Sequence, residues 1–401
     1  MNAFSPIFAF FPILIALLTA STLLKHCNLQ LGRSSRFSSI DGLRGYLALF
    51  VFLHHSTIWY LYLKDGRWQA PPSLLYTNFG QIGVALFFVI TGFLFSFKLI
   101  DAIKKKKSID WTQLFVSRVL RLVPLYFFVM LVLVLIILVL TNFSLITSFS
   151  VFVNRVMYWL GFTIFGHPDI NGVQSTWVIM AGVAWSLPYE WFYYFSLPLL
   201  GFLIGIRVPV LYVLLSLGTF YLFYILPFEI VHLYYFGVGI VSAVFVGNRY
   251  LTILAKHRFA DYFLTMLLLS TFFLLDKQNI NIILIILFIF FLAITNGNSL
   301  FGILTHKLSI FLGEMSYSLY LLHGIIFFIV FKFLLGFRYA SSFPPIMYWG
   351  VVSICALILV VCSFVTYTWI EAPAMQRVKY FSNLLRSRIP LKGYMKRLKP
   401  H

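Results

Sequence analysis

Six ionisable side chains lie inside long apolar stretches of this sequence or at the ends of such stretches. A charge in an apolar environment is costly, so each of these residues is a candidate functional residue. Histidine exchanges protons near neutral pH, a carboxylate orients or exchanges protons, and arginine binds anions. The set therefore predicts acid–base chemistry on an anionic substrate. Its members are Arg44, His54, His55, Glu190, His323 and Glu371.

Arg44 and His55 are eleven residues apart. In a helix, eleven steps return to within about 20° of the start and rise ~16 Å, so both side chains face the same way at different depths. Asp41, three residues before Arg44, shares this face. The stripe suits an anionic ligand, with a cation at the mouth of a site and a proton acceptor deeper inside. His54 points about 100° away and is expected to hydrogen-bond a neighbouring helix.

Arg118 and Arg121 lie one helical turn apart at the start of another apolar stretch. Guanidinium groups bind phosphate with two parallel hydrogen bonds, so this pair is a candidate donor-binding site. The alternative is that both belong to the excess of basic residues on the cytoplasmic side of membrane proteins. The Lys104–Lys107 run is assigned to that excess alone.

The string Trp185–Glu190 (WSLPYE) enters the next apolar stretch. Ser186 and Glu190 share a helical face, and Pro188 is expected to loosen the helix there. A buried carboxylate needs a partner, and we expect Glu190 to orient His55. The alternative is a glutamate that only packs between helices.

Ser316, Tyr320 and His323 also share one helical face, with Tyr317 beside them. They are expected to support the site, although serine and tyrosine often join helices by hydrogen bonds without further function. Glu371, at the end of the last apolar stretch, is expected to form a structural ion pair with Arg44, Arg118 or Arg121.

The composition sets the fold class that must position these residues. Hydrophobic residues make up 61% of the 401 residues and charged residues 10%, against about 45–50% and ~25% in soluble domains. A soluble enzyme, a disordered chain and a disulfide-stapled module are excluded. The sequence predicts an all-α polytopic membrane protein. Three cysteines without metal-binding or redox spacing are predicted to pack in the interior: Cys27, Cys355 and Cys362.

Hydropathy predicts about eleven transmembrane helices, because each needs ~20 mostly apolar residues. A twelfth apolar segment, 151–165, is short and is expected to be interfacial or re-entrant. The predicted spans are 4–24, 46–63, 80–100, 122–147, 177–205, 208–226, 230–247, 260–275, 279–296, 311–336 and 346–370.

The net charge of +19 follows the predicted topology. Alternate loops carry 24 of the 30 Lys and Arg residues, which assigns these loops to the cytoplasm. The N-terminus is then outside and the C-terminus inside, and the basic tail 377–401 is expected to lie on anionic lipid. No nucleic-acid partner, metal site or permanently bound cofactor is predicted.

Six strings together resemble the acyltransferase-3 family of integral-membrane acyltransferases, over roughly residues 36–376. Each string alone is weak, and their shared order makes the resemblance specific. The strings are IDGLRG at 40–45 with ten residues between Arg44 and His55, GVALFFVITGF at 83–93, RVLRLVP at 118–124, WSLPYE at 185–190, LGEMSYSLYLLH at 312–323 and IEAP at 370–373.

The resemblance implies ten core helices, an acyl-CoA donor on the cytoplasmic side, and a sugar or lipid-linked glycan as acceptor. It also implies that His55 is essential and that Arg118 and Arg121 act in donor binding. The chain departs from the family pattern in its extra N-terminal helix and linker (1–35), in Trp191 where a second acid is common, and in Ala372 where arginine is usual before Pro373. These departures leave the identity of the acceptor undetermined.

The expected protein is therefore a multi-pass enzyme of the bacterial inner membrane. It would move an acetyl group from acetyl-CoA to a hydroxyl of a cell-surface polysaccharide, such as lipopolysaccharide O-antigen. His55 would be the general base or a transient acyl carrier. Because the sequence includes no fused hydrolase-like domain, the acceptor is expected to meet the membrane domain directly. The alternatives are another acceptor (peptidoglycan, exopolysaccharide or lipid), a transporter or flippase of lipid-linked sugars, and a non-catalytic scaffold.

Overall fold

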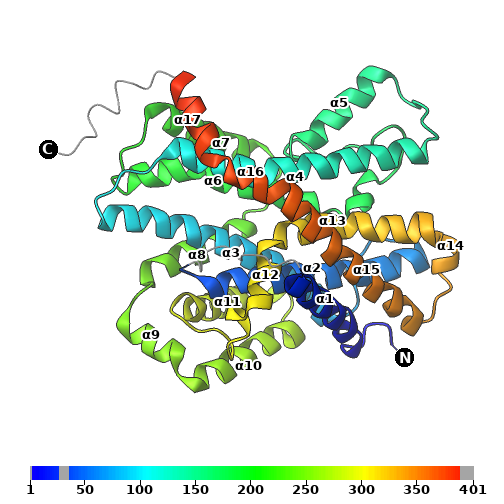
Figure 1. The fold of residues 1–401 in the computed structure, drawn as a ribbon, viewed down its shortest axis with the longest axis horizontal. Coiled ribbons are helices and arrows are strands. Elements are labelled where there is room, and N and C mark those ends of the chain that lie inside the picture. The colour runs from blue at the N-terminus through cyan, green and yellow to red at the C-terminus, as the bar shows by residue number, and fades with distance from the viewer. Residues whose placement is uncertain (1, 27–35, 389–401) are drawn as a thin grey trace.

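A computed structural model of the chain describes residues 2–26 and 36–388. These residues fold entirely into helices and connecting loops, with no strand among them, which confirms the predicted all-α fold (Figure 1). Cys27, the linker 27–35 and the end of the basic tail, 389–401, lie outside the described residues.

Six helices are long and apolar enough to cross a membrane. A seventh span results if α8 (Val231–Phe245) and α9 (Arg249–Lys256), bent by 107°, are counted as one. The chain is thus a multi-pass membrane protein, but the structure does not confirm eleven spans. The six are α1 (Ile7–His26), α2 (Ser38–Asp65), α3 (Leu74–Lys104), α4 (Trp111–Leu140), α13 with the π-helical turn that follows it (Ser316–Leu334), and α15 (Pro345–Thr366) with its continuation to Ser387.

Shorter helices account for most of the difference. The helices α7 and α11 have 16 residues each and reach ~24 Å, less than the ~30 Å of a hydrocarbon core. Hydropathy scores such segments as spans because it measures apolarity and not helix length. The shorter helices are α5 (Phe149–Leu160), α6 (Leu187–Leu203), α7 (Val210–Ile225), α10 (Arg258–Leu274), α11 (Ile280–Thr295), α12 (Lys307–Glu314), α14 (Phe337–Ala340), α16 (Ala372–Gln376) and α17 (Val378–Arg388).

The predicted span 177–205 is not one helix. It begins with two short 3₁₀ turns, Thr176–Met180 and Val183–Ser186, separated by a left-handed bend at Ala181 (φ 53°) and Gly182 (φ 69°). The prediction that Pro188 loosens a helix is therefore wrong. Pro188 lies in the first turn of α6, where its missing N–H costs no hydrogen bond.

The bent segment packs tightly on α13. A Cβ at Gly324 would lie 2.3 Å from the carbonyl carbon of Met180, so only glycine fits between the two backbones. Met180 and Val183 are buried. Irregular backbone is tolerated inside a membrane protein when the protein itself covers it, and α13 supplies this cover.

The helices α2 and α12 also approach each other through glycine. A Cβ at Gly313 would lie 1.7 Å from the carbonyl oxygen of Asp41, and one at Gly42 would lie 1.9 Å from that of Leu304. The glycine face of the string 40–45 is thus the packing face of α2. Arg44 is turned away from this contact and faces a cavity.

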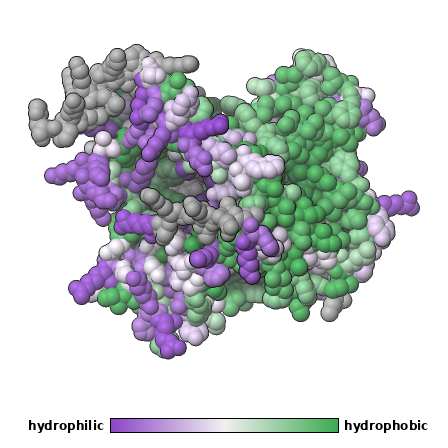
Figure 2. Space-filling model, in the orientation of Figure 1, coloured by the Kyte–Doolittle hydropathy of each residue, from purple (hydrophilic) through white to green (hydrophobic). Residues whose placement is uncertain are grey.

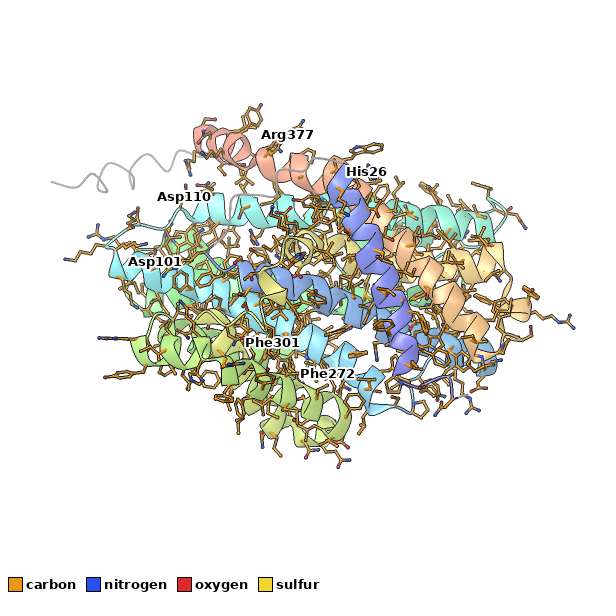
Figure 3. The ribbon with its side chains drawn as sticks, turned by 60° about the horizontal axis from the view of Figure 1, so that its bottom comes forward. His26, Asp101, Asp110, Phe272, Phe301 and Arg377 are labelled. Carbon is orange, nitrogen blue, oxygen red and sulfur yellow. The ribbon has the colours of Figure 1, made fainter. Side chains whose placement is uncertain are left out.

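Hydrophilic residues gather at one end of the molecule, on the left in Figure 2, while the right-hand part of this view is largely hydrophobic. Ion pairs join helix ends there. Arg36 lies 3.9 Å from Asp101, and Arg386 of α17 contacts Asp110 before α4. Asp101 and Asp110 mark this end in Figure 3. The side of the membrane that this hydrophilic end faces stays a prediction.

The additional N-terminal helix is an integral part of the bundle. Phe8 of α1 stacks on Trp349 of α15 with ring centroids 5.8 Å apart, and the Trp349 indole N–H donates to the carbonyl of Ala3 (2.8 Å). The hydroxyl of Tyr76, from α3, donates to the carbonyl of Ser5 (3.0 Å). These contacts tie α1 and the residues just before it to α15 and α3.

The contact between α2 and α12 leads to a first prediction. Gly313→Ala should destabilise the protein by about 1–3 kcal/mol, because the new methyl group must push two backbones apart. The matched control is Gly350→Ala in α15, where a Cβ meets nothing within 4 Å and alanine favours the helix. Thermal unfolding of both variants in detergent provides the measurement. Equal unfolding midpoints for the two variants would show that the contact between α2 and α12 at Gly313 is not tight.

Candidate active site

A cavity of about 610 Å³ lies between α2, α3, α4, α6 and the α12–α13 region. Nine of the thirteen residues that the sequence predicts for the site line it, from four different segments of the chain. The structure therefore brings most of the predicted site together. The nine are Asp41, Arg44, Arg118, Arg121, Ser186, Glu190, Ser316, Tyr317 and Tyr320.

Two arginines in this cavity, Arg44 and Arg118, make no ion pair within the described part of the chain. The guanidinium of Arg118 lies 5.1 Å from the ring centre of Phe95 and 5.8 Å from that of Tyr194. Aromatic faces hold a guanidinium in place without neutralising its charge. Arg44 and Arg118 thus remain able to bind an anion.

Arg121 is engaged differently. One of its guanidinium nitrogens lies 2.9 Å from a carboxylate oxygen of Glu371, whose side chain is 1% exposed. Ser318 donates a hydrogen bond to the other carboxylate oxygen, and its own hydroxyl lies 2.9 Å from that of Thr366. Of the three arginines considered as partners of Glu371, Arg121 is the one that pairs. Much of its charge is therefore already compensated.

Glu190 lies in the first turn of α6, where the N–H groups of the helix start favour a carboxylate. It accepts a hydrogen bond from Tyr194, one turn further along. No hydrogen bond joins Glu190 to His55 among the described residues, contrary to our expectation. The reason is the bent segment before α6, which starts the helix at the cavity and directs Glu190 into it. Asp41 and Glu314 also line the cavity.

His55 has another histidine as its partner. Its Nδ1 lies 3.0 Å from the carbonyl oxygen of Val51 and 3.1 Å from Nε2 of His323 on α13. His54 faces α3, where its Nδ1 lies 2.8 Å from the carbonyl oxygen of Tyr76. The ring of His54 covers Gly80, and a Cβ there would lie 2.4 Å away. The two neighbouring histidines thus have different surroundings, as their helical phase predicts.

The histidine pair lies beside the cavity and is not part of its lining. Tyr320 lines the cavity and also contacts the histidine pair through His323. Its hydroxyl lies 2.8 Å from that of Ser186 and donates to the carbonyl of Val183 (3.0 Å), and its ring centre is 6.2 Å from that of His323. Trp185 also lies outside the lining and packs against His232, with ring centres 4.8 Å apart.

Sequence reasoning missed several residues of the site, among them Tyr194 and Glu314 in the cavity lining and Ser318 beside Glu371. Tyr194 follows Glu190 by four residues, so the one-turn spacing could have identified it. Ser318 lies 53 residues from Glu371, and no local pattern connects them. Together the residues form a cavity suited to an acidic ligand, next to a pair of histidines able to accept a proton.

The chain also matches the model of a known protein family. A family model described as an acyltransferase domain, the acyltransferase-3 model, matches residues 37–368 and confirms the resemblance seen in the sequence. Neither the curated proteins nor the solved structures include a match. The match covers α2 to α15 and leaves α1 outside.

The buried ion pair leads to a second prediction. Glu371→Ala should destabilise the protein by about 3 kcal/mol, because it leaves the Arg121 guanidinium without its counterion. Asp101→Ala, which removes an exposed pair with Lys105, should cost less than about 1 kcal/mol. Chemical denaturation of both variants in detergent compares them. A loss no larger for Glu371→Ala than for Asp101→Ala would contradict the structural role of the pair.

Proposed function

The chain belongs to the acyltransferase-3 family, and we propose from this premise that it is a membrane O-acetyltransferase acting on a cell-surface polysaccharide. It is a membrane acyltransferase by family and by fold. The observation that carries the proposal is the cavity in which Arg44 and Arg118 point inward, one side chain away from the pair of His55 and His323.

The donor is proposed to be acetyl-CoA, a substrate whose phosphates carry its negative charge. Arg44 and Arg118, which form no ion pair among the described residues, provide two guanidinium groups for these phosphates, while Arg121 is held by Glu371. Apolar residues such as Val84, Phe87 and Leu94 line the cavity further along α3. They suit the uncharged arm of the donor that leads to the thioester.

The reaction that fits this geometry is acyl transfer to a hydroxyl group. His55 takes the proton of the acceptor hydroxyl, and the hydroxyl oxygen attacks the thioester carbonyl carbon. The carbon–sulfur bond breaks, and the thiolate leaves with the proton that His55 had taken. The products are an ester and free coenzyme A thiol. A transient acyl group on His55 would reach the same products in two transfers.

The acceptor is proposed to be a sugar hydroxyl, such as one of lipopolysaccharide O-antigen, at the inner membrane of a bacterium. The charged end of the molecule would face the cytoplasm, where the donor is made, with the N-terminus outside and the C-terminus inside. Peptidoglycan, exopolysaccharide or lipid acceptors follow the same chemistry. Mass spectrometry of surface glycans from a deletion strain would identify the acceptor.

A third prediction concerns which histidine acts. His55→Ala should reduce acetylation by a factor of 10² to 10⁴, roughly the contribution of a general base. His54→Ala should stay within about tenfold of the parent enzyme, because the hydrogen bond of the His54 ring goes to the backbone of α3 and its contact with the His55 ring, with centres 5.0 Å apart, is edge-on packing. Acceptor acetylation in vesicles at matched protein levels is the measurement. An active His55→Ala variant would show that His55 is not the catalytic base.

A fourth prediction concerns the donor. Arg118→Ala should raise the KM for acyl-CoA by roughly 10–100-fold, the equivalent of one hydrogen bond to a charged group, with little change in the KM for the acceptor. Arg118→Lys should recover only part of the loss in donor binding, because an ammonium group cannot form the two parallel hydrogen bonds of a guanidinium group. Lys105→Ala, which removes an exposed cation outside the cavity, is the control. An unchanged donor KM in Arg118→Ala would exclude this arginine from the donor site.

A further inference from the structure

His323 is fully buried on α13, and its Nε2 lies 3.1 Å from Nδ1 of His55. We propose that His323 is a positioning residue that holds the proton of His55 on Nδ1 and leaves Nε2 of His55 as the basic atom. The inference rests on the proposed function, in which His55 accepts the proton of the acceptor hydroxyl. The assignment follows from what each neighbouring atom is able to donate or accept.

The first step concerns His323 itself. Its Nδ1 lies 3.2 Å from the carbonyl oxygen of Leu319. A carbonyl oxygen only accepts hydrogen bonds, so Nδ1 of His323 must carry the proton. In a neutral imidazole the other nitrogen then has a lone pair. Nε2 of His323 is therefore an acceptor.

The second step concerns His55. Its Nδ1 faces two acceptors, Nε2 of His323 and the carbonyl oxygen of Val51, at 3.1 and 3.0 Å. The opposite tautomer would place a lone pair of His55 against the Val51 oxygen and a lone pair of His323 against the Leu319 oxygen. Both backbone contacts thus favour the same arrangement. Nδ1 of His55 donates, and Nε2 of His55 is left free to accept a proton.

The packing around the pair holds this geometry. Phe52, one turn before His55, stacks on Phe327, one turn after His323, with ring centres 4.9 Å apart and planes at 13°. This stack keeps α2 and α13 in register at the level of the histidines. Directly after His323 on α13, Gly324 lies against the bent segment at Met180. His323 therefore has little freedom to rotate out of the contact.

The contact with His323 matters for catalysis when Nε2 of His55 takes the proton from the hydroxyl group of the acceptor substrate. The resulting imidazolium still donates its Nδ1–H to the lone pair of His323, so the buried charge keeps a hydrogen-bond acceptor. In hydrolytic triads a carboxylate has this position and fixes the tautomer. Here the carboxylate of Glu190 hydrogen-bonds Tyr194 in the cavity, and a neutral histidine takes the position beside His55.

Nitrogen-15 NMR of the full-length protein in membranes, labelled at histidine, tests the tautomer without any substrate. The His55 signals are assigned by their loss in His55→Gln. We expect a protonated Nδ1 and an unprotonated Nε2 in the parent protein. In His323→Leu we expect a larger share of the tautomer protonated at Nε2, because only the Val51 carbonyl then accepts a hydrogen bond from Nδ1 of His55. A protonated Nε2 in the parent protein, or an unchanged His55 signal in His323→Leu, would overturn the inference.

Steady-state kinetics supply the second readout. His323→Leu should lower kcat roughly 10–100-fold, the usual effect of losing a residue that orients a reactive imidazole, with an unchanged KM for acyl-CoA. His323→Gln should recover part of kcat, because its amide oxygen accepts the same hydrogen bond. His54→Gln, outside the pair, is the control. Parental kcat in His323→Leu, or no recovery in His323→Gln, would contradict the positioning role.

The two readouts also separate this inference from the proposed function. A parent protein without acyl transfer activity would remove the proposed function and the catalytic role of His323 with it, even if NMR found the expected tautomer. Transfer that depends on His55 but is indifferent to His323 would leave the function in place and remove the inference alone.

Discussion

A polar group inside an apolar helical bundle must find its partner within the protein, because lipid tails offer none. This constraint explains most of the site. Glu371 is satisfied by Arg121 and Ser318, Glu190 by Tyr194, and His55 by His323 and a backbone carbonyl. Each partner comes from a particular helix contact. The bundle therefore determines which charges are compensated and which remain available for a substrate.

The distribution of partners also separates structural from reactive groups that look alike in sequence. Two adjacent histidines differ because one covers Gly80 and the other meets a second imidazole. Two arginines one turn apart differ because Arg121 has a buried counterion and Arg118 has aromatic neighbours. A cation that lines a cavity without an ion pair is costly to keep. The proposed anionic substrate would supply such a partner for Arg118.

Composition predicted the fold class, and helical periodicity predicted many of the charged and polar residues that line the cavity. Arg44, Arg118 and Glu190, for example, lie on faces that spacing alone identifies. Periodicity describes one helix at a time, so it could not assign partners across helices. The pairing of His55 with Glu190 was wrong for this reason. It also could not detect the bend at Ala181 and Gly182, where tight packing against Gly324 stabilises a left-handed backbone.

The position of His55 relative to the cavity constrains how two substrates meet. Along α2, Arg44 lies toward the charged end and Trp68 follows the opposite end of the helix, with its ring 6.4 Å from that of His55. The cavity reaches Tyr320 but not His55, while His55 is itself partly exposed. In the proposed function, a donor bound at Arg44 and Arg118 would extend its thioester past Tyr320 to reach His55. An acceptor that reached His55 on the side of Trp68 would meet the thioester at this imidazole while the donor is still bound.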